Sequence, residues 1–441
     1  MLNKNLWIAD RKELFSRICL DLIILIIPFY NKIYLTTDSE QFIFSLVFVG
    51  TWIIVNYIFG RYHFKQKSNI SYIKYFFKVF FSSFLLVLFC ILISFLNFFK
   101  INISELLILF LEKSILSFVI QILFYKLLTN RSIKNFNVWF FKGTNNRLNT
   151  IRKYTYNDES IILTNSLNEL KYLMGDSCNN FKGIIFDEVS NQELNFDSLK
   201  LKNNAPIQKI SAFKWCESYF YKLPTEFIKN TDLKYNYEYY NFQTRLKNIS
   251  DIILSIILLI ITIPIFLLVI VLIKLEDGGT VFYSQERIGK NGLIFKILKF
   301  RSMKIDAEKN GPVWSKRGDK RITNIGKLLR ISRIDELPQL FCVLKGEMSL
   351  IGPRPERPEI EKTLEKEIPY YSYRRALKPG LSGWAQVNYP YGASLEDAKE
   401  KTSYDIFYIE NFSNILDIII FFKTIKLVFN LKGAVPKKQI D

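Results

Sequence analysis

The chain has 441 residues, which is long enough for two or three domains. Lysine and arginine total 60 against 41 aspartate and glutamate, and the net charge of +19 favours anionic lipid headgroups or phosphorylated substrates as partners. No nucleic-acid motif accompanies this charge, so no nucleic-acid partner is expected. The 5 cysteines lack metal-ligand spacing and the 1 histidine, His63, lies in a basic loop, which argues against a zinc site, a disulfide framework and Ser-His-Asp chemistry.

The first part of the chain, residues 1–130, is dominated by four apolar blocks, each near the ~20 residues that a helix needs to cross a bilayer. The blocks are Ile18–Tyr34, Phe42–Phe59, Val79–Phe99 and Leu106–Tyr125. Basic residues lie before the first block, between the second and third, and after the fourth, and such residues stay in the cytoplasm. We therefore expect a four-helix transmembrane bundle with both ends on the cytoplasmic side.

Residues 131–234 show a different pattern, in which the short apolar runs VWFFK, SIILTN and GIIFDE alternate with polar, helix-compatible segments. This alternation predicts a parallel sheet of Rossmann-like type. The turn after the first run, KGTNNR, contains Gly143 alone, so it lacks the glycine-rich cradle that binds phosphate. We expect a degenerate α/β domain that binds no nucleotide.

A fifth apolar block, residues 250–274, has Pro264 near its middle and lies near the start of a third predicted domain, residues 235–441. Residues 274–333 carry 15 basic and 6 acidic residues, which a transmembrane span would place outside the cell. Proline breaks or kinks a helix, and the halves on either side cover only ~20 and ~15 Å of the ~30 Å hydrocarbon core. The block predicts a re-entrant helix–break–helix that dips into the membrane at Pro264, with a kinked span as the alternative.

The third domain is otherwise expected to be mainly α-helical and monotopic. Its last apolar segment, Asn414–Asn430, is interrupted by polar residues at helical spacing. This pattern is typical of an amphipathic helix that lies in the membrane interface.

An adjacent pair of carboxylates, Asp335 and Glu336, stands out in the stretch ISRIDELPQLFCVLKGEMSLIGPRPERP. The pattern from Ile331 to Gly346 predicts a short helix with Asp335 near its start and Pro338 in the first turn. One interpretation is therefore structural, with Asp335 as an N-cap and Glu336 as a first-turn acid favoured by the helix dipole.

The surrounding cations favour a chemical interpretation. Lys299, Arg301, Arg330, Arg333 and Arg354 exceed what two carboxylates need as ion-pair partners. Such an excess suits a bound diphosphate, whose oxygens arginine forks can grip. A carboxylate can attack phosphorus to form an acyl phosphate, and Mg²⁺ held by one or two carboxylates and substrate phosphates would reduce the charge repulsion. The combination predicts phosphoryl transfer between a soluble diphosphate and a lipid phosphate.

Three stretches in succession, QERIGKNGLIFKILKFRSM, RISRIDELPQLFCVLKGEMSLIGPRPERP and KPGLSGWAQVNYPYG, resemble the signatures of the bacterial sugar transferase family. The resemblance covers about residues 245–433, and the preceding bundle and α/β domain are similar to the long form of the family. It implies transfer of hexose 1-phosphate from a UDP-sugar to undecaprenyl phosphate, with release of UMP, at the start of exopolysaccharide, capsule or O-antigen repeat units. The implied location is the bacterial inner (cytoplasmic) membrane, with several spans and the catalytic domain on its cytoplasmic face.

The resemblance also implies roles for individual residues. Asp335 matches the family's nucleophile, and Glu336 matches the neighbour that holds Mg²⁺ or assists proton transfer, so both are candidate metal ligands. Matches to phosphate or active-site ligands are Lys299, Arg330 and Arg354, with Arg301 beside them in KFRSM. Trp384 and Gln386 lie in GLSGWAQV, expected near the nucleotide-sugar, with a turn and a core tryptophan as the alternative. Arg333, where the family often has a small residue, has no assigned role.

Two other classes of function fit the sequence less well. A polysaccharide transporter or channel predicts many polar positions inside the spans, whereas the motifs here lie outside them. A scaffold without activity predicts a broken acidic pair, and the pair is intact.

The sequence leaves the identity of the sugar open among glucose, galactose and an N-acetylated hexosamine, with the extended region after GPRP favouring a simple hexose. The long-form resemblance suggests a homodimer.

Overall fold

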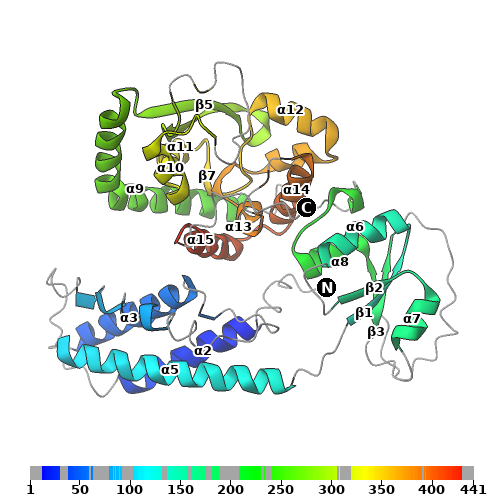
Figure 1. Cartoon of the computed structure of the whole chain (residues 1–441), viewed down its shortest axis with the longest axis horizontal. Coiled ribbons are helices and arrows are strands. Elements are labelled where there is room, and N and C mark those ends of the chain that lie inside the picture. The colour runs from blue at the N-terminus through cyan, green and yellow to red at the C-terminus, as the bar shows by residue number, and fades with distance from the viewer. Residues whose placement is uncertain are drawn as a thin grey trace. The chain divides into compact units, whose positions relative to one another are not determined.

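The fold is described from a computed structural model of the chain (Figure 1). The structure describes residues 12–29, 38–58, 61–62, positions 79–82, 84, 86–88 and 90–91, then 103–131, 137–155, 161–174, 181–187, 208–229, 233, 241–304, 307, 319–389, 392 and 394–429. The chain divides into two compact units, Met1–Asn137 and Val138–Asp441. The predicted α/β and catalytic segments both belong to the second unit, and the domain limits at residues 130 and 234 stay predictions.

The first unit is helical where it is described. Its helices are α2 (Lys12–Phe29), α3 (Asp38–Ile58) and α5 (Ile103–Arg131), with helical residues also between Val79 and Ile91. Phe48, Trp52 and Phe110 form an aromatic core with ring centroids 5.1–6.0 Å apart. These helices overlap the predicted spans, but among the described residues one helix alone is long and apolar enough to cross a membrane, and it lies in the second unit. The four-helix membrane bundle therefore stays a prediction.

A buried polar network joins the helices of the first unit. The Asp21 carboxylate accepts hydrogen bonds from Trp52 Nε1 at 3.2 Å, Tyr62 Oη at 2.7 Å and Gln121 Nε2 at 3.1 Å, and also from the Ser117 hydroxyl. The Arg61 guanidinium lies 3.9 Å from the same carboxylate. Because these groups are fully buried, each depends on the others for its partners, and the network fixes how α2, α3 and α5 pack.

The α/β part of the second unit contains a four-stranded sheet with strand order β2-β1-β3-β4. Its elements are β1 (Asn137–Lys142), α6 (Asn145–Thr155), β2 (Ile161–Thr164), α7 (Leu167–Met174), β3 (Phe181–Phe186), β4 (Gln208–Ser211) and α8 (Ala212–Phe220). Strand β3 pairs in parallel with β1 and with β4. Gly183 is required in β3 because a Cβ there would lie 2.1 Å from the Gln208 carbonyl oxygen. The predicted parallel sheet is confirmed, and its Rossmann-like classification stays a prediction.

The rest of the second unit combines helices with two small two-stranded sheets (Figure 1). Its elements are α9 (Asn241–Asp277), β5 (Phe282–Ile288), β6 (Ile294–Phe300), α10 (Asn324–Ser332), α11 (Gln339–Leu344), β7 (Ser349–Ile351), α12 (Pro358–Glu367), β8 (Gly380–Ser382), α13 (Trp384–Asn388), α14 (Leu395–Glu410) and α15 (Asn414–Phe429). Short 3-10 helices occupy Thr225–Phe227, Lys290–Gly292, Ile334–Glu336 and Tyr371–Ala376. Strands β5 and β6 form an antiparallel hairpin, and β7 pairs in parallel with β8. Helix α15 covers the predicted C-terminal amphipathic segment.

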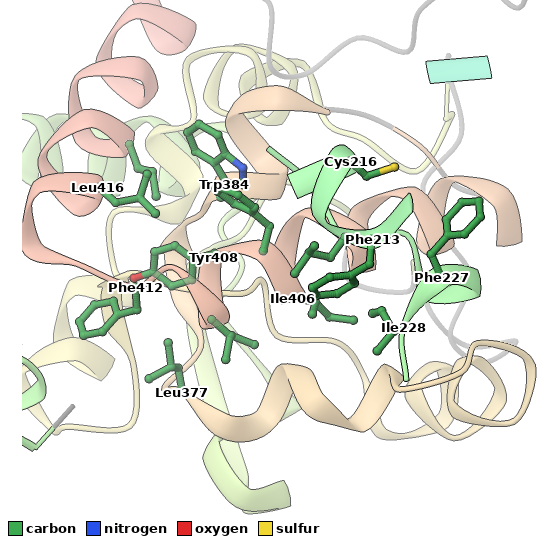
Figure 2. Close-up of a cluster of buried hydrophobic side chains, with 14 of the residues drawn as sticks. Phe213, Cys216, Phe227, Ile228, Leu377, Trp384, Ile406, Tyr408, Phe412 and Leu416 are labelled. Carbon is green, nitrogen blue, oxygen red and sulfur yellow. The ribbon is translucent and has the colours of Figure 1, made fainter. Parts of the chain in front are cut away.

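One buried cluster joins α8 and the turn after it to the helices of the C-terminal part. Figure 2 shows Phe213, Cys216, Phe227 and Ile228 on one side of this cluster and Trp384, Ile406 and Tyr408 on the other. Backbone bonds add to the packing, because Leu223 N–H donates to the Ser403 carbonyl at 2.8 Å. Residues 211–228 are therefore part of the same core as α13 and α14.

Helix α9 contains the predicted membrane dip. The expected break is wrong in one respect, because the helix is continuous from Asn241 to Asp277 with Pro264 inside it. It is bent instead, and Figure 1 shows its two arms running in different directions. Proline removes one backbone donor, and the Thr262 hydroxyl bonds back to the Leu258 carbonyl at 2.7 Å, an arrangement that bends helices without interrupting them.

Both arms of α9 return to the same body of the protein. On the first arm, Lys247 Nζ lies 2.6 Å from Asp417 Oδ2 of α15, and the Asp251 carboxylate accepts from Ser349 Oγ of β7 at 2.6 Å. On the second arm, Val269 and Ile273 are buried against Phe300 and Leu329. The apolar side chains near the bend, including Ile260, Ile261, Ile263, Leu267 and Leu268, are 52–64% exposed. This geometry agrees with a helix that enters and leaves a membrane on one face.

We predict that cysteines placed at the exposed positions Arg245 and Thr280, in a chain without native cysteines, are labelled by an impermeant thiol reagent from the same side of the membrane. The reason is that both arms of α9 are tied to one folded body. Pro264→Leu restores a backbone donor in a continuous apolar helix and should shift a fraction of the chains to a straight span, which exposes Thr280 on the opposite side. Labelling of the two positions from opposite sides in the otherwise native sequence would contradict the dip.

Candidate active site

The acidic pair lies in a tight turn between two helices. Helix α10 begins at Thr323, whose hydroxyl accepts from Gly326 N–H at 2.9 Å, and ends at Arg333 in the left-handed conformation, with φ 60° and ψ 15°. Asp335 and Glu336 follow in the 3-10 helix Ile334–Glu336. Helix α11 starts only at Gln339, after Pro338, and has no side-chain cap. The structural interpretation of Asp335 as an N-cap is therefore wrong, and the predicted single helix is a 3-10 turn followed by a short α-helix.

Glu336 is the centre of a cluster of cations. Its Oε1 lies 2.7 Å from Arg354 Nη2, 3.3 Å from Lys299 Nζ and 3.4 Å from Arg333 Nη1, and its Oε2 lies 3.4 Å from the same Arg333 nitrogen. Burial alone would raise the pKa of Glu336, but Arg354, Lys299 and Arg333 outweigh it and hold the pKa well below its usual value. Glu336 is therefore ionised at neutral pH, and Arg333, whose role the sequence left open, is one of its partners.

Asp335 has a different environment although it is the adjacent residue. It is 7% exposed, and its Oδ1 has no hydrogen-bond partner among the described residues. Burial, and then the charge of Glu336, raise its pKa from 3.8 to about 6, against the opposing effect of Lys299, Arg330 and Arg333. At neutral pH the turn thus holds a buried, ionised and weakly solvated carboxylate, which is the state required of a nucleophile.

The cations come from separate parts of the chain. Lys299 lies at the end of β6, Arg333 ends α10, and Arg354 lies in the loop between β7 and α12. Burial lowers the pKa of Lys299, while the Glu336 charge favours its protonated form. Arg330 lies near enough to Asp335 to lower its pKa. The structure therefore brings three of the predicted substrate-binding residues, Lys299, Arg330 and Arg354, close to the acidic pair, and adds Arg333.

Three other predicted residues lie elsewhere. Arg301 is buried and pairs with Asp277 at the end of α9. Trp384 is 2% exposed, its Nε1 donates to the Tyr221 carbonyl at 2.8 Å, and Figure 2 shows it inside the hydrophobic cluster. Gln386 Nε2 donates to the Leu381 carbonyl at 3.3 Å. These contacts favour the alternative of a core tryptophan in GLSGWAQV, and they give Arg301 a structural partner.

The candidate ligands for a metal ion are the same two carboxylates. Among the described residues no group of three or more His, Cys, Asp or Glu side chains is placed to hold a metal ion. Mg²⁺ commonly takes only one or two carboxylates and completes its shell with substrate phosphates and water. Asp335 Oδ1, a buried oxygen without a partner, fits this requirement better than Glu336, whose oxygens already contact three cations.

At the edge of the α/β sheet where β1 and β3 end, side chains of the protein pair with one another. Arg147 of α6 lies 2.6 Å from Asp187 Oδ1, and its guanidinium is 5.6 Å from the Phe227 ring. A Cβ at Gly143 would lie 2.6 Å from the Phe141 ring. In parallel α/β sheets a dinucleotide binds at this point, where the strand order reverses. The internal ion pair gives a physical reason for the predicted lack of nucleotide binding.

We predict that the α/β segment binds no dinucleotide, because the turn after β1 lacks a glycine-rich phosphate cradle and Arg147 beside it already pairs with Asp187. Calorimetry of the full chain in detergent with NAD should detect no binding tighter than about 1 mM. Micromolar binding that is abolished by Gly143→Val would overturn the prediction.

We further predict that the two carboxylates have opposite effects on stability. The pKa of Asp335 is raised in the folded state, so protonation of this group favours folding. Its contribution to stability is complete below the usual pKa and is lost as the pH rises through about 6. Asp335→Asn should therefore raise the thermal midpoint at about pH 8 and lose this advantage toward about pH 4. The folded pKa of Glu336 is lowered, so its contribution is present above the usual pKa and lost in acid, and Glu336→Gln should lower the midpoint at about pH 8. Equal midpoints for both variants across this range would contradict the assigned environments.

Comparison with known proteins places this site in a family. The family model described as Bacterial sugar transferase matches residues 242–431, which include the whole acidic turn and its cations. A Bacillus subtilis protein named putative undecaprenyl-phosphate N-acetylgalactosaminyl 1-phosphate transferase is 52% identical over 147 residues, which are 32% of this chain and 82% of that protein. The chain belongs to the bacterial sugar transferase family, as the motifs predicted.

Two longer relatives share a smaller part of their length. The Aeromonas hydrophila UDP-N-acetylgalactosamine-undecaprenyl-phosphate N-acetylgalactosaminephosphotransferase is 47% identical over 189 residues, 43% of this chain and 45% of that protein. The Xanthomonas campestris UDP-glucose:undecaprenyl-phosphate glucose-1-phosphate transferase is 39% identical over 197 residues, 44% of this chain and 41% of the relative. The match thus covers less than half of either long relative.

Proposed function

We propose that this chain transfers a sugar 1-phosphate from a UDP-sugar to undecaprenyl phosphate, and that Asp335 is the nucleophile. The observation that carries the proposal is the buried carboxylate of Asp335, which lies beside Glu336 and among cations that exceed the two local negative charges. The names of the related proteins, which specify undecaprenyl phosphate as acceptor, support the choice of substrates.

The reaction has two displacements. A carboxylate oxygen of Asp335 attacks the phosphorus that bears the sugar, the bond from that phosphorus to the bridging oxygen breaks, and UMP leaves with the electron pair. A phosphate oxygen of undecaprenyl phosphate then attacks the same phosphorus, and the Asp335 carboxylate is released. Lys299, Arg330, Arg333 and Arg354 would neutralise the phosphate oxygens, and the contacts of ionised Glu336 with three of these cations support this role.

Mg²⁺ would be held by Asp335, with Glu336 behind it, and by the substrate's phosphates. When bound, it supplies positive charge that lowers the repulsion between the carboxylate and the diphosphate. Exclusion of bulk water from the buried Asp335 protects the acyl phosphate against hydrolysis.

The proposed setting is the cytoplasmic face of the bacterial inner membrane. The dip of α9 and the exposed apolar side chains of α15 would anchor the catalytic part where a soluble donor and a lipid acceptor meet. The four N-terminal spans, a homodimer and a role in exopolysaccharide or O-antigen synthesis belong to the same proposal.

The donor sugar is proposed from the comparisons. The two relatives with N-acetylgalactosamine in their names are 47% and 52% identical to this chain, whereas the glucose-named relative from Xanthomonas is 39% identical. We therefore place an N-acetylated hexosamine before the simple hexose that the region after GPRP had favoured.

The test is UMP release by the full-length protein with undecaprenyl phosphate and Mg²⁺, across UDP-glucose, UDP-galactose and their N-acetylated forms. We expect UDP-N-acetylgalactosamine to give the highest kcat/KM. Asp335→Asn should reduce turnover by at least about 10³-fold because an amide cannot form the acyl phosphate, and Glu359→Gln, an exposed acid on α12, should leave it unchanged. An Asp335→Asn protein with near-native turnover would exclude Asp335 as the nucleophile.

A further inference from the structure

The loop that carries Arg354 is held by an unusual set of donors. Its residues Gly352–Glu356 connect β7 to α12 without regular structure, and two of them are prolines, which have no N–H. Four successive carbonyl oxygens nevertheless accept hydrogen bonds from distant parts of the chain. The pairs are Pro353 with Gly380 N–H at 2.9 Å, Arg354 with Arg374 Nη2 at 2.8 Å, Pro355 with Arg287 Nη1 at 3.2 Å and Glu356 with Ile288 N–H at 3.0 Å.

The bond to the Arg354 carbonyl comes from a guanidinium that is itself fixed in three directions. Arg374 Nε donates to Asp405 Oδ2 at 2.8 Å, Nη1 donates to Tyr371 Oη at 2.5 Å, and Nη2 donates to Arg354 O at 2.8 Å. Arg374 is 9% exposed and Asp405 is 1% exposed. The planar guanidinium makes these three directions interdependent, so Asp405 on α14 determines where Nη2 points.

Burial of this pair is not explained by stability alone. Taking an arginine and an aspartate out of water costs about as much as their attraction returns, and apolar residues of similar volume often serve a core equally well. The pair directs one N–H donor, Arg374 Nη2, at the carbonyl oxygen of Arg354. The side chain of Arg354 is the one that contacts Glu336. The Arg354 side chain is 35% exposed and reaches Glu336 through one nitrogen, so its aim depends on its backbone.

We propose that Arg374 and Asp405 are positioning residues that fix the backbone of Arg354 and thereby aim its guanidinium at Glu336 and at the phosphates of the donor. This inference rests on the proposed function. Neither residue contacts the acidic pair in the structure, and neither was singled out by the sequence motifs. Lysine at position 374 would keep the charge but lose the fork, and asparagine at position 405 would keep an acceptor oxygen but lose the charge.

The chain provides a matched control in the next residue. Arg375 lies in the same 3-10 helix, Tyr371–Ala376, but its Nε pairs with Glu361 at 2.6 Å and its Nη2 with Glu365 at 2.8 Å. Both partners lie on α12, where Glu361 is buried and Glu365 is exposed. Arg375→Lys therefore makes the same chemical change without touching the Arg354 carbonyl.

The experiment measures kcat, KM for the UDP-sugar and the thermal midpoint for Arg374→Lys, Asp405→Asn and Arg375→Lys in the full-length protein. We expect kcat/KM to fall roughly 10- to 100-fold for Arg374→Lys, less for Asp405→Asn, and within about twofold for Arg375→Lys. The same three changes are then made in an Arg354→Ala background. There, Arg374→Lys should alter kcat/KM by less than about threefold, because the residue it positions is gone.

The outcomes separate the two proposals. An unmodified chain that releases no UMP from any UDP-sugar overturns the proposed function, and this inference with it. A functional chain in which Arg374→Lys behaves like Arg375→Lys overturns the positioning role alone. A full additional loss in the Arg354→Ala background also overturns it, because that result indicates general damage to the fold. Asp405→Asn keeps the test decisive if Arg374→Lys does not fold.

Discussion

Two adjacent carboxylates buried under one set of cations form the constraint on which the catalytic part depends. Three cations contact Glu336, and none of them hydrogen-bonds to Asp335. Burial raises the pKa of Asp335, and the nearby charge of Glu336, which the cations keep ionised, raises it further. The asymmetry gives two neighbouring residues of one 3-10 turn different states, a counter-ion paired with three cations and a carboxylate that we propose as the reactive group.

This constraint explains why distant segments must pack together. Removing one partner from a buried ion pair costs about 3–5 kcal/mol, because an uncompensated charge stays behind. The cations must therefore be delivered by elements that are themselves rigid, namely the end of the β5–β6 hairpin, the left-handed end of α10 and the loop after β7. The positive φ of Arg333 is part of this arrangement, since it turns the chain sharply enough to place its own guanidinium on Glu336, three residues later.

The bent helix α9, whose exposed apolar side chains we propose as the membrane contact, is also packed against the elements of the acidic turn. Its first arm fixes β7 through Asp251 and Ser349, and β7 leads directly into the loop of Arg354. On its second arm, Phe266 packs against Phe300, next to Lys299, with ring centroids 4.9 Å apart. A change in the bend of α9 would therefore displace two strands that support the acidic turn, β7 before Arg354 and β6 with Lys299. The same helix is thus the proposed membrane contact and a support for two of the cations, Lys299 and Arg354.

The sequence by itself determined the family, the acidic pair, most of its cations, the parallel strands and the proline at the centre of α9. These features depend on residue type and local spacing, which are visible along the chain.

Tertiary structure decided which residues from distant parts of the chain come into contact, which local spacing does not determine. It placed Trp384 in a core shared with residues 211–228, gave Arg301 to Asp277, brought Arg333 onto Glu336, and joined Asp405 to Arg354 through Arg374. It also showed that Pro264 bends α9 without interrupting it, because contacts on both arms hold the helix on either side of the missing donor. Each of these outcomes depends on which side chains meet across long separations in the chain, and burial decides those meetings only once the whole core has formed.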